Sequence, residues 1–203
     1  SANRFIVLLK IMFNLAKKLQ IPGSDVNPAM GIKIGDPNNA RERYLTKEET
    51  QRLLASIQTS ENPQLKYIVP LLLLTGARKR EILDAKWEDI DLSRRYLRVP
   101  LSKSGKPRYV PLSTAALDIL QRVPRWDDCP YVVPNPKTLK PFLSLYCCWD
   151  NARKRAGLLD VRIHDLRHSY ASNLVNAGAS IFVVSKALGH ANLKNTMRYS
   201  HLS

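Results

Sequence analysis

The side chains best suited to chemistry lie in three short segments, and the first two segments carry cations. Arg78 follows a Thr-Gly pair, and Glu81 stands three residues later, where it can hold the guanidinium from the side. His164 and Arg167 are also three residues apart, so on a helix an imidazole and a second guanidinium project from one face. Fixed cationic donors of this kind are what a metal-free catalyst needs where charge gathers on the oxygens of a phosphodiester.

The third segment adds a further donor and a candidate nucleophile. His190 follows Leu188-Gly189 near an expected helix boundary, and Tyr199 lies nine residues after His190. Five other tyrosines lie in strand or helix patterns where packing explains them, and the spacing from His190 separates Tyr199 from these five: Tyr96, Tyr109, Tyr131, Tyr146 and Tyr170.

Helices are expected to position most of these residues. The apolar pattern of residues 46–84 is helical with a break at Thr75-Gly76, and Thr46 with Glu49 forms a capping-box pattern at its start. Glycines punctuate the second half of the chain, where we expect helices at 113–122, 141–156, 164–177, 180–188 and 192–200.

A basic β-hairpin is expected between residues 95 and 112. Leu97, Val99 and Leu101 alternate with other residues, and the run Ser-Lys-Ser-Gly-Lys-Pro turns the chain before it returns. Residues 94–108 hold six Lys or Arg and no acid, and from this region we expect the following to contact DNA: Arg98, Lys106 and Arg108. The fold class is therefore mainly α with a small antiparallel β-hairpin or sheet, that is, α+β.

The amino-terminal segment is expected to stand apart from the rest. Apolar residues recur at helical spacing from Phe5 to Leu19, and the pattern ends near Pro22-Gly23. The apolar face of this helix needs a partner, and the chain opens without a helix start signal. We therefore expect a helical piece at 1–34, a linker at 35–44, a larger domain at 45–203, and truncation at both ends.

Composition limits the classes of function. The 203 residues carry 32 Lys and Arg against 17 Asp and Glu, a net charge of +15, which predicts an anionic partner such as DNA, RNA or a membrane surface. The longest apolar run, 68–74, is too short to span a membrane. Three cysteines without a C-x-x-C spacing indicate neither a disulfide framework nor a zinc site, and they favour a reducing cytoplasm.

Cofactors and metals are not expected. No nucleotide-binding Gly-rich loop and no carboxylate cluster for two Mg²⁺ is present in the sequence. His164 and His168 have the spacing of a zinc pair, but Arg167 shares their face and would repel a cation. His168 is expected to be a buried, hydrogen-bonded helix residue rather than a catalyst.

Four segments in fixed order, TGARKREIL, HDLRH, LGH and RYSH, resemble the signature boxes of the tyrosine recombinase or phage integrase family. The resemblance covers residues 45–203, and the amino-terminal helix with Asn27-Pro28 resembles the end of that family's core-binding domain. It implies the catalytic-domain fold and an enzyme that cuts and rejoins duplex DNA through a 3′-phosphotyrosyl intermediate, without ATP or metal, for integration or excision of a mobile element.

The resemblance also implies a role for each matching residue. Arg78 and Arg167 would clamp the scissile phosphate, and His190 would donate a third hydrogen bond. Tyr199 would attack, and since the reference pKa of a phenol is about 10, His164 and the arginines would take its proton or stabilise its charge. In the hairpin turn, a lysine would protonate the departing 5′ oxygen; this lysine is Lys103, with Lys106 as the rival.

Two alternatives remain open: a type IB topoisomerase, which shares the chemistry, and a non-catalytic DNA-binding module. The resemblance implies a tetramer on DNA for the full-length protein, and we expect that this shorter chain can be a monomer. A prokaryotic cytoplasm, in association with the nucleoid, is the expected location.

Overall fold

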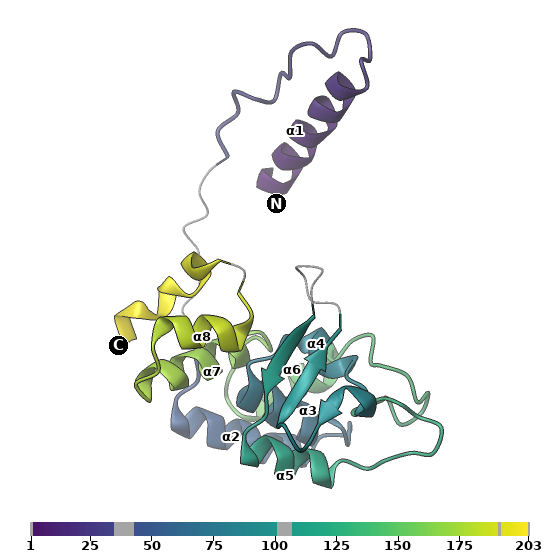
Figure 1. The fold of residues 1–203 in the computed structure, drawn as a ribbon, viewed down its shortest axis with the longest axis vertical. Coiled ribbons are helices and arrows are strands. Elements are labelled where there is room, and N and C mark those ends of the chain that lie inside the picture. Colours follow the sequence, from purple (N-terminus) through teal and green to yellow (C-terminus); the bar gives the residue numbers. More distant parts are fainter. Residues whose placement is uncertain (1, 35–42, 101–106, 191, 203) are drawn as a thin grey trace. The chain divides into compact units, whose positions relative to one another are not determined.

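The computed structural model describes residues 2–34, 43–100, 107–190 and 192–202 (Figure 1). It divides the chain into two compact units, Ser1–Arg41 and Glu42–Ser203. The division falls inside the expected linker, whose residues 35–42 lie outside the described residues.

The first unit is one helix with a returning segment. Helix α1 spans Ala2–Lys18, and the chain then turns back along it. Asn27 Nδ2 donates to the carbonyl of Lys10 at 3.1 Å, and Lys10 Nζ donates to the carbonyl of Ile32 at 2.9 Å. Within the unit most of the apolar side chains of α1 stay exposed. Its identity as part of a core-binding domain stays a prediction.

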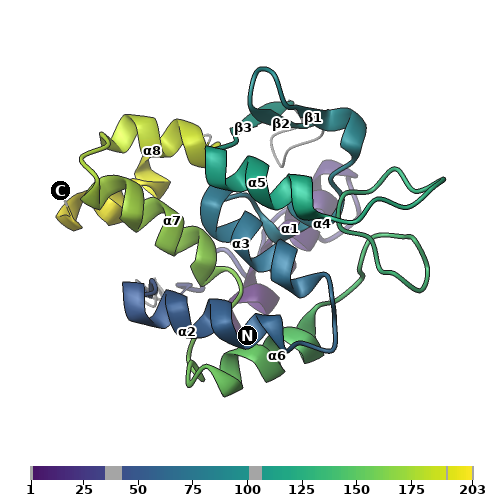
Figure 2. The ribbon, with the colours of Figure 1, turned by 90° about the horizontal axis from the view of Figure 1, so that it is seen from below.

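The second unit is built around α3, Leu65–Thr75, which contacts α2 (Lys47–Gln58), α5 (Thr114–Arg122) and α7 (Asp165–Asn176) (Figure 2). Helix α3 is apolar on nearly every side, so it is buried as the centre of the core. The remaining helices are α4 (Lys79–Leu83), α6 (Tyr146–Arg155) and α8 (Ile181–Leu188). No described helix combines the length and the apolar character that crossing a membrane requires.

A three-stranded antiparallel sheet packs beside these helices. Its order is β1 (Ile90–Asp91), β2 (Tyr96–Val99) and β3 (Arg108–Pro111), and Val99 pairs with Arg108. The expected hairpin and the mainly helical α+β class are confirmed, while β1 was not expected. The hairpin turn, with Lys103 and Lys106, lies outside the described residues.

Three expected helices differ in the structure. The helix expected at 192–200 is a pair of 3₁₀ turns, η2 (Leu193–Asn195) and η3 (Met197–Leu202), and the Asn192 side chain caps the first of them. The segment after Thr46 breaks once more before Leu65, because the side chains of Ser60 and Asn62 bond local backbone amides. Helix α6 begins at Tyr146 rather than at 141. A further 3₁₀ turn, η1, spans Trp87–Asp89.

Candidate active site

The turn after α3 presents Arg78. Gly76 ends the helix in a left-handed conformation, with φ +59°, and Arg78 is the N-cap residue of α4. Glu81, in the first turn of α4, accepts 2.7 Å bonds from both the backbone N and the Nη1 of Arg78. The sequence-based expectation that Glu81 holds this guanidinium agrees with the geometry.

Glu81 also accepts from a second guanidinium. Arg108 on β3 donates Nη2 to Glu81 Oε2 at 2.8 Å and Nε to Oε1 at 3.2 Å. Although burial acts to raise it, the pKa of Glu81 lies below its ordinary value because Arg108 and Arg78 bond the ionised carboxylate. One ionised carboxylate therefore fixes two guanidiniums.

Arg167 on α7 is buried, with 5% of its surface exposed, and its fork spans two helix ends. Its Nη1 donates to the carbonyl of Gly76 at 2.5 Å, and its Nη2 donates to the carbonyl of Leu188 at 2.6 Å. Burial, followed by the charges of Arg108 and Arg78, lowers the pKa of Arg167 to about 10. The mutual effect shows that three guanidiniums gather in one place, although they are spread over 90 positions of sequence.

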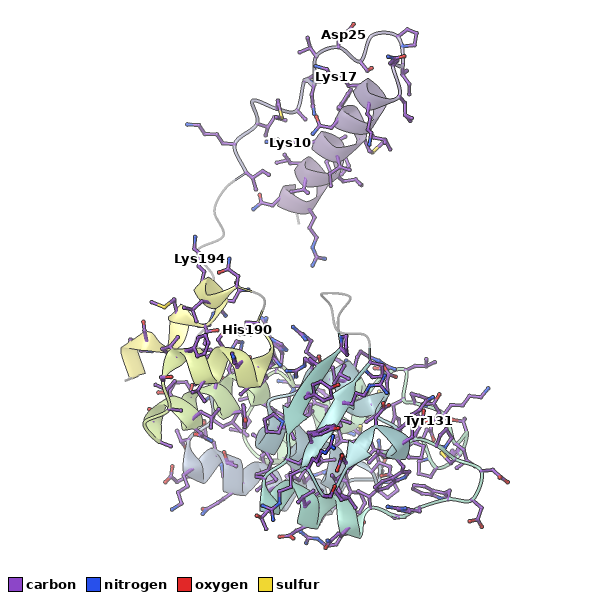
Figure 3. All side chains as sticks on the ribbon, viewed as in Figure 1. Lys10, Lys17, Asp25, Tyr131, His190 and Lys194 are labelled. Carbon is purple, nitrogen blue, oxygen red and sulfur yellow. The ribbon has the colours of Figure 1, made fainter. Side chains whose placement is uncertain are left out.

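His190 follows the end of α8 (Figure 3), where Gly189 adopts φ +65°. Its Nδ1 lies 2.7 Å from Thr196 Oγ1. Burial, followed by the charges of Arg167 and Arg78, lowers the pKa of His190 to about 4. The ring is therefore neutral at neutral pH. In the tautomer in which Nδ1 accepts from the Thr196 hydroxyl, the ring proton lies on Nε2, as a donor to an anion requires.

Tyr199, in η3, is buried with 6% of its surface exposed, in an apolar cluster with Val175, Val184 and Leu188. Its hydroxyl is hydrogen-bonded to Nδ1 of His168 on α7. Burial raises the pKa of Tyr199, while the charges of Arg198 and Arg167 oppose the rise. The candidate nucleophile thus lies near the guanidinium cluster but is covered.

His164 stands just before α7, and its ring packs edge-on against His168 with centroids 5.2 Å apart. The pKa of His164 is lowered by burial and by the charges of Arg167 and Arg78, whereas that of His168 falls to about 4 through burial and the charge of His164. His168 is hydrogen-bonded, as expected, but its partner is the candidate nucleophile. The spacing of four from His164 was the signal that could have placed His168 at the site.

The structure therefore brings five of the expected catalytic residues together: Arg78, His164, Arg167, His190 and Tyr199. Lys103 lies outside the described residues, and so does Lys106, which leaves the acid role a prediction. Arg98 is exposed on β2, 3.7 Å from Asp89, and its DNA contact also stays a prediction. The side chain of Arg108 is 9% exposed, and its DNA contact stays a prediction as well. No group of three or more potential metal ligands occurs among the described residues.

Comparisons with known proteins agree with this arrangement. Residues 43–203 match the phage integrase family. The integrase of Salmonella phage P22 is 32% identical over 185 residues, which are 85% of this chain and 47% of that protein. A tyrosine recombinase of Thermosipho africanus is 30% identical over 204 residues, 99% of this chain and 71% of that protein. The chain thus spans about half to seven tenths of the length of the curated relatives it matches.

Solved structures show the same fold. The catalytic domain of bacteriophage HP1 integrase superposes with a TM-score of 0.64 at 29% identity, covering 79% of this chain and 88% of that one. A lambda integrase dimer bound to a COC′ core site superposes with a TM-score of 0.78 at 21% identity, covering 98% of this chain and 72% of that one. From its sequence match and its fold, the chain belongs to the phage integrase family of tyrosine recombinases.

Proposed function

We propose that this chain carries the catalytic centre of a site-specific DNA recombinase that cuts and rejoins duplex DNA through a 3′-phosphotyrosyl intermediate. The observation that carries the proposal is the guanidinium pair of Arg78 and Arg167, locked by Glu81 and by two helix-end carbonyls next to the buried phenol of Tyr199. Guanidiniums held in this way are ready to bind a phosphodiester without reorganising during the reaction.

In the proposed reaction Tyr199 Oη attacks the scissile phosphorus. A P–Oη bond forms, the P–O5′ bond breaks, and the 5′ oxygen leaves with a proton that we assign to Lys103. The phenolic proton goes to a base, and the geometry favours His168 over His164, because the hydroxyl of Tyr199 is bonded to the His168 ring. A neutral imidazole is able to accept that proton.

Rejoining is the reverse reaction with a different 5′ hydroxyl. The energy of the phosphodiester bond is retained in the tyrosyl ester, so no nucleotide cofactor is consumed. In this proposal the donors Arg78, Arg167 and His190 bind the non-bridging oxygens, which do not change partners, so they would stabilise the same charge in both directions.

Duplex DNA is the partner we propose. The net charge of +15 favours a polyanion, and related integrases of lambda and Tn1549 have been solved with DNA. We also propose a tetramer for the full-length protein on DNA and a cytoplasmic, nucleoid-associated location. The measured mass of the full-length protein–DNA complex tests the first, and the overlap of a fluorescent fusion with the nucleoid tests the second.

The direct test is trapping of the intermediate. Nicked suicide duplexes of random core sequence are incubated with the protein in EDTA, and DNA covalently attached to protein is measured after denaturation. We expect an adduct for the wild type and for Tyr146→Phe, a change at an exposed tyrosine, and none for Tyr199→Phe. Duplex binding without an adduct would favour a non-catalytic module.

A second measurement separates recombination from topoisomerase activity. Adduct-forming sequences are recovered, paired in one reaction with labelled partner duplexes, and examined for exchanged strands. Strand exchange between partners supports the recombinase, whereas relaxation of supercoiled plasmid without exchange would support the topoisomerase alternative.

A further inference from the structure

Arg108 is bonded through all three of its guanidinium nitrogens. Nε and Nη2 contact the two oxygens of Glu81, and Nη1 donates to the carbonyl of Ala187 at 3.1 Å. The side chain is 9% exposed and that of Glu81 is 7% exposed. Three of the five N–H groups of this guanidinium are therefore already bonded to the protein.

The first of these contacts supports the phosphate clamp. Each oxygen of Glu81 accepts one bond from Arg78 and one from Arg108. Without Arg108, the buried Glu81 carboxylate would keep only two of its four hydrogen-bond donors. It could then rotate about its side-chain bonds. The guanidinium of Arg78 would then lose the fixed position that makes it a preorganised donor.

The second contact supports the turn that carries His190. The last carbonyls of α8 have no partner within the helix, and here Arg108 bonds that of Ala187 while Arg167 bonds that of Leu188. Strand β3 and the end of α8 are neighbours in space (Figure 2). Positive charge at a helix C-terminus is also favourable for the helix dipole.

Gly189 shows how closely this guanidinium approaches the turn. A Cβ at Gly189 would lie 2.6 Å from Nη1 and 2.8 Å from Cδ of Arg108. The LGH segment therefore needs glycine for two reasons, its φ of +65° and the space that Arg108 occupies. His190 is the residue that directly follows Gly189, so it lies next to this contact.

From these contacts we infer that Arg108 is a positioning residue. From its place on the basic hairpin, it fixes the position of the Arg78 guanidinium relative to the turn that carries His190. The inference rests on the proposed function for its effect on rate. It is an alternative to the expectation that Arg108 binds DNA directly, and it links the hairpin that carries Lys103 to both halves of the phosphate site.

The test compares Arg108→Met and Arg108→Lys with Arg122→Met, a matched change at an exposed arginine of α5. Single-turnover cleavage of a suicide duplex is measured at saturating protein, and DNA affinity is measured over a range of salt concentrations. We expect Arg108→Met to cleave about 100-fold more slowly, as displaced catalytic groups do, with affinity and salt slope unchanged. Arg108→Lys can bond only one of the two acceptors, Glu81 or the Ala187 carbonyl, at a time. It should therefore cleave faster than Arg108→Met but more slowly than the wild type.

The opposite pattern would overturn the inference. A normal rate at saturation, together with a salt slope reduced by about one unit, would make Arg108 a phosphate contact. If Arg108→Met does not fold, Gly189→Ala tests the same contact by pushing on the guanidinium, with Gly178→Ala as the control, since Gly178 also has positive φ but open space around it. The Gly189 change should slow cleavage more than its control, and equal rates would count against the role.

One readout does not depend on cleavage. Arg108→Lys retains the charge, so a change in the ring resonances of His190 in the NMR spectrum of the free protein reports a moved turn. Unchanged His190 resonances in this variant would contradict the positioning role. Failure of the wild type to form an adduct would instead contradict the proposed function, and the His190 measurement would still decide the role of Arg108.

Discussion

Neutral histidines surround a buried phenol in this site. His168 and His190 both have pKa values lowered to about 4, and that of His164 is lowered as well, through burial and the neighbouring positive charges. At neutral pH the positive charge of the site therefore comes from arginines, and the imidazoles donate or accept hydrogen bonds.

The bond between His168 and Tyr199 leads to a prediction about rate. His168→Gln keeps a group that can accept a hydrogen bond but cannot take a proton, so cleavage should slow about 100-fold, the lower end of what general bases contribute. His164→Gln should slow it less. Single-turnover cleavage at saturating DNA measures both, and a larger loss for His164→Gln would return the base role to His164.

The lowered pKa values of these histidines predict how the free energy of unfolding depends on pH. In the unfolded chain they bind protons below about pH 6.5, whereas the folded protein binds them at His168 and His190 only near pH 4. Between these values the unfolded state holds more protons, so the free energy of unfolding must fall as pH falls from about 6.5 to about 4. Urea unfolding at a series of pH values should show this loss, and His168→Gln should show a shallower one; an equal slope would contradict the assignment.

Breaks between elements place several of the catalytic groups, while α7 carries Arg167 and His168. The break between α3 and α4 supplies both Arg78 and the Gly76 carbonyl that receives Arg167, and the end of α8 supplies the Leu188 carbonyl and His190. Backbone conformation at these breaks is therefore part of the site.

Gly76→Ala tests this at the first break. An added Cβ would lie 2.2 Å from the ring of Tyr170, and φ of +59° is unfavourable for alanine by at least about 1 kcal/mol. Gly157→Ala is the control, because Gly157 has φ +70° and nothing within 4 Å of an added Cβ. Thermal unfolding should show a larger loss for Gly76→Ala, with slower cleavage in that variant alone; equal losses would show that conformation, and not the contact with Tyr170, sets the effect.

The sequence predicted those parts of the site that are local. Arg78 with Glu81 and the capping box at Thr46 follow from spacing within a single turn, and the hairpin follows from alternation. The bonds of Arg108 to Glu81 and Ala187 cross 27 and 79 positions, and the bond of His168 to Tyr199 crosses 31. Pairings of that range depend on tertiary packing, which no local pattern records. The spacing of the apolar residues near Tyr199 is similar to that of a helix, so a helix is expected there, but the segment forms 3₁₀ turns.

Across the whole molecule, the core belongs to the second unit. Both hydrophobic clusters of the described residues draw their members from positions 45–199, and the two units divide at residue 41. We predict that a fragment of residues 43–203 unfolds in one cooperative transition, at a temperature within a few degrees of that of the whole chain. Calorimetry of both proteins measures this, and loss of the transition in the fragment would show that residues 1–41 contribute to the core.

The order in which the chain is made also matters for its activity. The carbonyls that receive Arg167 and Arg108 include those of Gly76, 91 residues before its partner, and Ala187, 79 residues after its partner. A nascent chain cannot assemble the phosphate-binding cluster until residue 188 has left the ribosome, and the tyrosine follows within a dozen codons. A partly synthesised chain, however well its first helices have folded, therefore lacks both the complete cluster and the proposed nucleophile.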